Sequence, residues 1–591
     1  MPELYQEFNV IWRAPLRSIA PVFVTVASLF IGRPLSGWPF GAPRNVAKDS
    51  KSPLYVARIK SMKLAPLLLG LMILTGCHPE NGTSTQALAD PTTLRRGIGG
   101  EPSSLDPGGA SDTFSYEVIR DLYEGLATES ADGQIMPGVA SSWSVDQTGT
   151  EYTFNLRHDA MWSNGRPVRA QDFIVAWRRV IDPKHASPLA DFLRPIAHAA
   201  EIIKGQLMPE QLGVRAPRDD LLVVQLQQPA PYFLQLLTHT ATFPIFSEEA
   251  AAAHTQEQWV SNGPYVLTSW VPSGNLHLTK NSRYWDAHDV RIRNVEYVPI
   301  SDENSELRQY RAGELDVTHT IPSAALPTLL NERRNEILAA PYLGTVYYAI
   351  NMHAPAYSQN GKLRQALAMA IDRRKLQSTL LVFGQTPAYA LVPPGTWNYD
   401  QQLWRWGSAS DDDRVAQARA LYTAAGYSPE NPLHLRCLVS DGSAIKAIAI
   451  AIASMWRETL GVETQLVSEE YRVFLNSRKD VSRWDVARLS WTADYNDAGN
   501  FLEVFRSNSP NNDPGYTSPQ YDSLLDAAAS TPEPIQRKEI LEKAERLMLS
   551  EYPIIPIYFY SSKRLIKPYV NGAKTNPLNR LYSKHLHIEP S

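Results

Sequence analysis

Hydrophobic and polar positions follow two different periods along most of the chain beyond residue 93. Apolar side chains recur three and four residues apart in several long stretches, which predicts amphipathic helices. These stretches are residues 170–180, 363–373, 413–425, 445–459 and 534–550. Other segments alternate or form short apolar runs, which predicts β-strands. They are residues 150–156, 345–351, 463–467 and 554–560. This mixture predicts an α/β or α+β fold, and the length of 591 residues indicates about two to four domains.

Two opposite charges interrupt one strand pattern, at residues 484–496 (WDVARLSWTADYN). Arg488 and Asp494 lie in a run whose neighbouring positions, such as Leu489 and Trp491, are apolar. Because buried charges require partners, the two side chains either form an ion pair within the protein or bind a ligand that carries both an acid and an amine. A short peptide is such a zwitterion.

Composition and motifs argue against several classes of function. The formal net charge of -4 provides no broad basic field for nucleic acid, so we expect no nucleic-acid partner. The chain contains no Gly-x-Ser-x-Gly, no His-Glu-x-x-His and no phosphate-binding loop. We therefore expect a binding protein without a cofactor, and not an enzyme. His585 and His587 have a spacing that is more typical of a solvated strand than of a metal site, so no metal is expected.

The region before residue 92 has the order of segments typical of an exported lipoprotein. Met62 and a lysine precede a short apolar run that ends in Leu-Thr-Gly-Cys at Cys77. This ending resembles a bacterial lipobox, so we expect residues 62–76 to be a lipoprotein signal peptide and Cys77 to be lipidated. The polar residues 77–92 are expected to form a flexible tether.

Residues 1–61 precede this complete signal. They include an apolar stretch, residues 18–31, that is interrupted by Pro21 and is too short to span a bilayer comfortably. We expect translation to begin at Met62, and the alternative is an additional membrane-proximal segment. Cys437 is the one cysteine of the expected exported body, and its alternating surroundings predict a core position without a disulfide.

Short motifs follow one another in a fixed order along the body of the chain. They are EPSSLDP at 101–107, LYEGL at 122–126, WSNG at 162–165, NGPY at 262–265, NSRYW at 281–285 and AGELD at 312–316. This ordered set resembles the family-5 extracytoplasmic solute-binding proteins, and the resemblance extends from about residue 94 to residue 588. ADYN at 493–496 and YFY at 558–560 are most similar to the oligopeptide-binding proteins of ABC importers, with murein-peptide-binding proteins as close relatives.

The resemblance implies an α/β, three-lobed fold of the type II periplasmic-binding-protein kind, with an extra inserted domain. The ligand cleft lies between lobes that close by hinge motion. By order along the chain, lobe I is expected at residues 93–123, 247–343 and 562–591, lobe II at 124–246 and lobe III at 344–561.

The resemblance also assigns roles to residues of the expected cleft. Asp494 matches the group that holds the peptide amino terminus, and Arg488 and Arg478 match groups that face carboxylates. Two segments, Ser111 to Thr113 and Leu489 to Trp491, are expected to pair with the peptide main chain. Aromatic side chains are expected to line side-chain pockets: Tyr342, Tyr347, Tyr471, Trp491 and Tyr560. Gly344 and Thr492 occupy two positions that carry a disulfide in typical enterobacterial members.

The function that the resemblance implies is capture of short peptides by a monomeric periplasmic lipoprotein, which delivers them to an ABC permease complex. Contact with the membrane would be made through the lipid on Cys77 alone. Two alternatives remain open: a receptor specific for murein tripeptide, and a chaperone-like surface protein that holds peptide chains.

Overall fold

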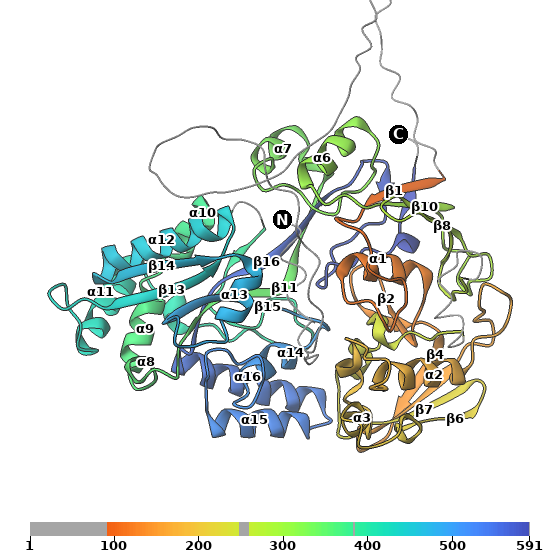
Figure 1. Ribbon diagram of the computed structural model, residues 1–591, viewed down its shortest axis with the longest axis horizontal. Helices are drawn as coiled ribbons and strands as arrows, with labels where there is room; N and C mark the ends of the chain where they lie inside the picture. Colours follow the sequence, from red (N-terminus) through yellow and green to blue (C-terminus); the bar gives the residue numbers. More distant parts are fainter. Residues whose placement is uncertain (1–91, 247–258, 382–383, 590–591) are drawn as a thin grey trace, which may run out of the picture. The chain divides into compact units, whose positions relative to one another are not determined.

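The computed structural model describes residues 92–246, 259–381 and 384–589 (Figure 1). The predicted N-terminal extension, the signal peptide, Cys77 and nearly all of the tether lie outside the described residues. Within the described ranges, no helix combines the length and apolar character needed to span a bilayer.

One four-stranded sheet is assembled from strands that are far apart in the sequence. Its order is β1 (Thr93–Gly97), β10 (Asn294–Val298), β9 (Leu276–Lys280) and β8 (Tyr265–Trp270). β1 runs parallel to β10, and the other pairs are antiparallel. Near the end of the chain, β17 (Val570–Asn571) pairs with β18 (His587–Ile588). All these strands fall within the ranges expected for lobe I.

A second four-stranded sheet lies entirely within the range expected for lobe II. It is antiparallel, with the order β4 (Ala140–Val145), β5 (Glu151–Leu156), β7 (Leu221–Gln225) and β6 (Val214–Arg218). Helix α2 (Ala170–Ile181) contacts this sheet, and Phe173 and Trp177 of the helix are fully buried. The strand predicted at 150–156 and the helix predicted at 170–180 are thus confirmed. A short hairpin, β2 (Ala127–Glu129) with β3 (Ile135–Pro137), precedes them.

The third sheet has six strands and contains the interrupted strand of the sequence pattern, β15. Its order is β12 (Thr386–Pro387), β16 (Ile554–Leu565), β11 (Ile337–Ile350), β15 (Val486–Thr492), β13 (His434–Ser440) and β14 (Glu463–Glu469). The sheet is antiparallel from β12 to β15 and parallel from β15 to β14. Cys437 in β13 is 1% exposed and free, as expected for a core thiol.

Strands β11 and β16 are longer than the patterns predicted, and they run through both expected boundaries between lobes I and III. Their antiparallel pairing is continuous from Ile337↔Leu565 to Pro341↔Ser561 and resumes at Thr345↔Phe559. The irregularity between Pro341 and Thr345 lies where the sequence alternation weakens. The two strands therefore form a double connection between those residue ranges.

Helices of the third region begin and end close to the predicted limits, with one exception. α11 (Asp411–Ala424), α12 (Ser443–Leu460) and α16 (Pro534–Glu551) match their predictions. The single helix predicted at 363–373 is wrong, because two helices are present, α9 (Gly361–Met369) and α10 (Arg373–Thr379). Asp372 caps α10 by accepting a hydrogen bond from the Lys375 backbone N at 2.9 Å, and this favours a new helix over continuation of the first. Over all the described residues, the other α-helices are α1 (Thr113–Leu122), α3 (Ala199–Ile203), α4 (Phe233–Leu236), α6 (Glu303–Ala312), α7 (Leu326–Glu332), α8 (Pro355–Ser358), α13 (Tyr471–Ser477), α14 (Gly499–Leu502) and α15 (Pro519–Ala529).

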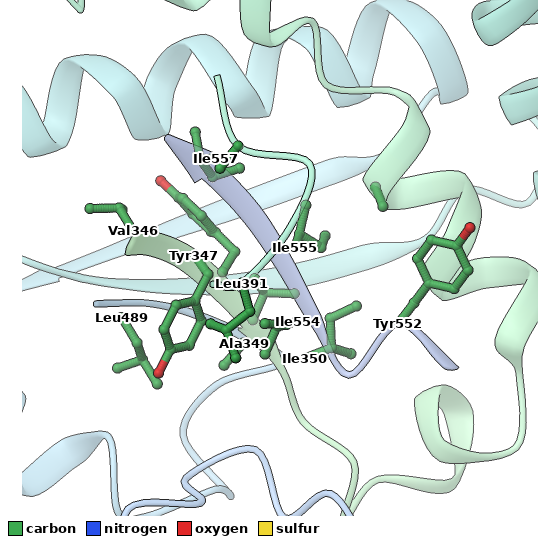
Figure 2. Close-up of a cluster of buried hydrophobic side chains, with 14 of the residues drawn as sticks. Val346, Tyr347, Ala349, Ile350, Leu391, Leu489, Tyr552, Ile554, Ile555 and Ile557 are labelled. Atoms are coloured by element: carbon green, nitrogen blue, oxygen red, sulfur yellow. The ribbon is translucent and has the colours of Figure 1, made fainter. Parts of the chain in front are cut away.

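The six-stranded sheet carries a continuous apolar core. Figure 2 shows Ile555 and Ile557 of β16, Val346 of β11 and Leu489 of β15 within one cluster of buried side chains. Each of these side chains is at most 4% exposed. Because burial of such side chains is a main source of stability, the core fixes β15 and the residues that follow it in one position.

Candidate functional site

A cavity of about 110 Å³ lies beside the end of β15. Its lining comes from segments that are distant in the sequence: 111–120, 492–494 and 578–580, together with His239, His319 and Tyr342. Such a volume has room for several water molecules, or for a polar group of a ligand.

Helix α1 supplies one wall of the cavity. Asp112 caps the helix, and its carboxylate accepts a hydrogen bond from the Ser115 backbone N at 2.8 Å. Apolar residues of α1, including Ile119, are fully buried on one side. The cavity residues of this helix share the i, i+3, i+4, i+7 spacing that places side chains on one face. They are Thr113, Tyr116, Glu117 and Arg120.

Asp494 contributes a shielded carboxylate to the wall of the same cavity. Burial raises the pKa of Asp494 to about 6, whereas a hydrogen bond from Asn500 and the positive charge of Arg580 act to lower it. Among the described residues, none forms an ion pair with this carboxylate. A cationic group that enters the cavity would therefore meet an acid whose ionised form it stabilises.

Arg580 supplies the positive charge that acts on the Asp494 carboxylate, and it already has an acidic partner. Its Nη1 lies 2.7 Å from Oε1 of Glu129, and both side chains are at most 4% exposed. Its Nη2 donates to the backbone carbonyl of Asp494 at 3.3 Å. Arg580 therefore holds the Asp494 backbone in place. Glu129 compensates the positive charge of Arg580.

The interpretation of Arg488 and Asp494 as an internal ion pair does not agree with the described residues, where no ion pair joins the two. Arg488 is 4% exposed, and its Nη2 donates to the Tyr560 hydroxyl at 3.3 Å. The Tyr560 ring is tilted against that of Tyr342, with 6.4 Å between centroids, and Tyr342 lines the cavity. A contiguous chain of side chains thus leads from the cavity to Arg488.

The other predicted site residues lie outside the wall of this cavity. Arg478 forms an ion pair with Asp513, with 3.4 Å between Nε and Oδ2. Tyr347 is 2% exposed, packs edge-on against Phe505 and lies opposite Leu489 in the β11–β15 ladder. Two further aromatic residues are partly buried against the same core, Tyr471 at the start of α13 and Trp491 in β15. Of the predicted residues, the cavity brings together Ser111, Thr113, Tyr342 and Asp494.

Gly344 and Thr492 are direct partners in the antiparallel ladder of β11 and β15. The structure therefore places side by side the two positions that the resemblance associates with a disulfide. A Cβ atom on Gly344 would lie 2.5 Å from the Tyr560 ring and 2.8 Å from Cγ2 of Thr492. The glycine thus permits the close approach of Tyr560 to the strand.

The sequence patterns did not identify several residues of the cavity. The four polar residues of α1 that share one helix face, at positions 113, 116, 117 and 120, are the signal that could have identified them. Glu117 of this helix face lies 3.2 Å from both the Arg96 guanidinium and Nδ1 of His319. Burial would raise the pKa of Glu117, but the hydrogen bond and charge of His319, together with Arg96, lower it to about 2. Glu117 therefore remains ionised and engaged.

His239 lies behind Tyr116 and fixes its ring. The His239 ring stacks on Phe192 at 3.9 Å between centroids and forms a T-shaped contact with the Tyr116 ring, with 5.0 Å between centroids. Burial, together with the charges of Arg580 and Arg120, lowers the pKa of His239 well below its usual value. His239 is consequently a neutral packing group.

No cluster of metal-ligating side chains occurs within the described ranges.

Comparison with known proteins identifies similar binding proteins. A family model described as bacterial extracellular solute-binding proteins, family 5 Middle, matches residues 134–513. The periplasmic murein peptide-binding protein MppA of Escherichia coli (strain K12) is 37% identical over 516 residues, covering 85% of this chain and 95% of that protein. The periplasmic oligopeptide-binding protein OppA of the same strain is 36% identical over 535 residues, covering 89% and 97%.

A solved structure of the murein tripeptide binding protein MppA in its unliganded open form is also similar. The TM-score is 0.77 at 36% identity, with 85% of this chain and 98% of that chain covered. The resemblance inferred from the ordered motifs is confirmed, as is the α/β fold of the type II periplasmic-binding-protein kind.

Proposed function

This chain belongs to the bacterial extracellular solute-binding proteins of family 5, and we therefore propose that it binds short peptides outside the cytoplasmic membrane and delivers them to an ABC importer. Two relatives that each align with more than four fifths of the chain are named for binding a murein peptide and oligopeptides. The proposed activity contains no catalytic step, because the peptide is bound and released unchanged.

The observation that carries this proposal is the Asp494 carboxylate in the cavity wall. It has no ion-pair partner among the described residues, and burial raises its pKa to about 6. The protonated α-amino group of a peptide supplies the missing positive charge and can donate hydrogen bonds to the carboxylate. A charge-assisted hydrogen bond of this kind contributes about 1.5–3 kcal/mol, which is sufficient to fix the position of the amino terminus.

The peptide then extends from Asp494 past Tyr342 towards Arg488, which receives its carboxylate with the help of Arg478. The contact of Tyr342 with Tyr560, and of Tyr560 with Arg488, supports this direction. Residues Ser111 to Thr113 and Leu489 to Trp491 pair with the peptide main chain, and such pairing is independent of side-chain identity. The remaining aromatic residues line side-chain pockets: Tyr347, Tyr471, Trp491 and Tyr560.

Closure of the binding cleft depends on the double connection formed by β11 and β16. In this proposal, residues 93–123, 247–343 and 562–591 form lobe I, residues 124–246 form lobe II and residues 344–561 form lobe III. The irregular pairing between Pro341 and Thr345 supports a hinge there, because few residues at the ends of elements usually absorb such a motion. Addition of a ligand peptide should therefore reduce the radius of gyration in small-angle scattering.

The anchoring and location of the protein form a separate part of the proposal. The mature protein is a monomer that begins at lipidated Cys77, lies in the periplasm and contacts the membrane through that lipid. Export is supported by the similarity to periplasmic relatives. Labelling of cells with a fatty-acid analogue should mark the wild-type protein and leave the Cys77→Ser variant unmarked. Equal labelling of both would contradict lipidation at Cys77.

Calorimetry with tri-alanine, tri-lysine and a murein tripeptide tests the proposed function. Binding of the two ordinary tripeptides, together with a smaller radius of gyration, is expected for a general peptide receptor. Binding of the murein tripeptide alone would favour a murein-specific receptor, which the 37% identity to MppA supports. Weak binding that is independent of peptide length, without a change in scattering, would favour a chaperone-like protein.

A further inference from the structure

The cavity beside Asp494 contains a second polar site, formed by Tyr116 and Arg120 of helix α1. The Tyr116 side chain is 9% exposed, and its hydroxyl is buried without a hydrogen-bond partner in the described chain. The Arg120 Nε is also buried and donates to no acceptor there. The guanidinium carbon lies 5.8 Å from the centroid of the Tyr116 ring, as the i, i+4 spacing of the two residues allows.

The acidic groups around this site are already engaged elsewhere. Glu117 contacts Arg96 and His319, and Glu129 contacts Arg580. Within the ranges that the structure describes, no carboxylate forms an ion pair with Arg120. The guanidinium nevertheless remains charged at neutral pH, because arginine is not deprotonated in proteins.

The Tyr116 ring packs against the His239 ring, with 5.0 Å between centroids and an angle of 71° between the planes, and this contact restricts the ring. Burial raises the pKa of Tyr116, and its surroundings carry both signs of charge: the negative charge of Asp494 also acts to raise this pKa, and the positive charge of Arg120 acts to lower it. A hydroxyl between two such groups can donate to an anion that lies on Arg120.

We propose that Arg120 and Tyr116 form a subsite for a carboxylate that the ligand carries close to its amino terminus. This proposal rests on the proposed function, since it takes Asp494 as the anchor of the amino group. Asp494, Tyr116 and Arg120 line the same cavity, and the charges of both Asp494 and Arg120 act on the Tyr116 hydroxyl, so an amine on Asp494 and an acid on Arg120 lie close together. The carboxylate therefore belongs to one of the first two residues of the peptide.

Two kinds of peptide carry such a group. In an ordinary peptide it is the side chain of an Asp or Glu residue. In a peptide in which glutamate is joined through its γ-carboxyl, it is the α-carboxylate, which that linkage leaves unsubstituted. Both present the same charge to Arg120 but at different distances from the amino group, so synthetic peptides distinguish them.

Calorimetry with pairs of peptides tests the subsite. The pairs are Ala-Glu-Ala with Ala-Gln-Ala, the γ-linked form of Ala-Glu-Ala with its α-amide, and Ala-Ala-Glu with Ala-Ala-Gln. At least one of the first two pairs should show about tenfold tighter binding of the acid, while the third should show less discrimination. The pair with the larger ratio identifies the source of the carboxylate.

The ratio of acid to amide affinity is then measured in Arg120→Gln and Tyr116→Phe. Arg120→Gln should reduce it to near one and Tyr116→Phe should reduce it partly. The control Arg308→Gln, at a side chain that is 70% exposed on α6, should leave the ratio as in the wild type. Equal binding of acid and amide by the wild type, or an unchanged ratio in both variants, would overturn the subsite while peptide binding stands. Failure of the wild type to bind any peptide would overturn the proposed function and the subsite together.

Discussion

The indole nitrogen of Trp491 donates a hydrogen bond to Oδ1 of Asn500, with 2.9 Å between the two atoms. An amide whose oxygen is engaged in this way presents its NH₂ group in a defined direction. The Asn500 side chain in turn hydrogen bonds to Asp494 and acts to lower the pKa of that carboxyl against the effect of burial. Trp491 therefore supports the cavity carboxylate through Asn500 without lining the cavity itself.

Asn500→Ala should weaken the binding of tri-alanine at pH 7 by about tenfold, because one hydrogen bond to the Asp494 carboxylate is lost. Trp491→Phe should have a smaller effect in the same direction, since it removes only the group that orients Asn500. Calorimetry on both variants provides the measurement. Asn431→Ala, at an exposed asparagine, is the matched control and should bind as the wild type does. An unchanged affinity in Asn500→Ala would show that this contact does not act on the ligand.

Peptide affinity should fall as the pH is lowered through about 6. Burial raises the pKa of Asp494 to about 6 in the peptide-free protein, and a bound ammonium group favours the ionised carboxylate, so binding lowers that pKa. Affinity is therefore full well above pH 6 and decreases by up to about tenfold per pH unit below it. The peptide amine remains protonated throughout, with a pKa of about 8.

Calorimetry with tri-alanine between pH 7.5 and 5 measures this dependence. Glu117, with its pKa of about 2, keeps its negative charge over this range. The variant Asp494→Asn lacks the titrating carboxylate and keeps every other cavity group, including His319 beside Glu117. Its affinity should therefore show little dependence on pH. A pH dependence that persists in Asp494→Asn would assign it to another group.

Glu129→Gln should lower the free energy of unfolding by about 3–5 kcal/mol, because it leaves the buried Arg580 charge without its acid. The two side chains are 4% and 1% exposed, and Glu129 also accepts a hydrogen bond from the Tyr582 hydroxyl at 3.1 Å. Urea unfolding of the mature protein gives the value. Glu151→Gln is the matched control, because its pair with Arg215 is largely exposed and should contribute less than about 1 kcal/mol. Similar losses in both variants would contradict a specific role for the buried pair.

Much of the fold could be predicted from the sequence where the apolar period is long and uninterrupted. The helix predicted at 445–459 corresponds to α12, and the strand at 463–467 lies within β14. The ends of β11 and β16 could not be predicted, because Pro341 and Ser561 interrupt the apolar pattern where the pairing continues. Long-range pairing overrode local preference at these positions.

The candidate site was predictable in part for a similar reason. Asp494 could be identified because an acid in an apolar run must have a partner. Arg120 lies in a helix whose polar face looks like an ordinary solvent-exposed surface, since helical spacing does not show what covers that face. Arg580 lies in a segment without regular periodicity, and its contact with Glu129 spans 451 residues of the chain. Such contacts depend on the tertiary fold.

The central claim, that Asp494 holds the amino group of a peptide, is tested most directly by one double comparison. The affinities of wild type and Asp494→Asn are measured for tri-alanine and for N-acetyl-tri-alanine by calorimetry. Acetylation should weaken binding to the wild type by about 2–5 kcal/mol and should have little effect on the variant, because the acid and the amine form one interaction. Equal affinity of the wild type for the two peptides would contradict the account.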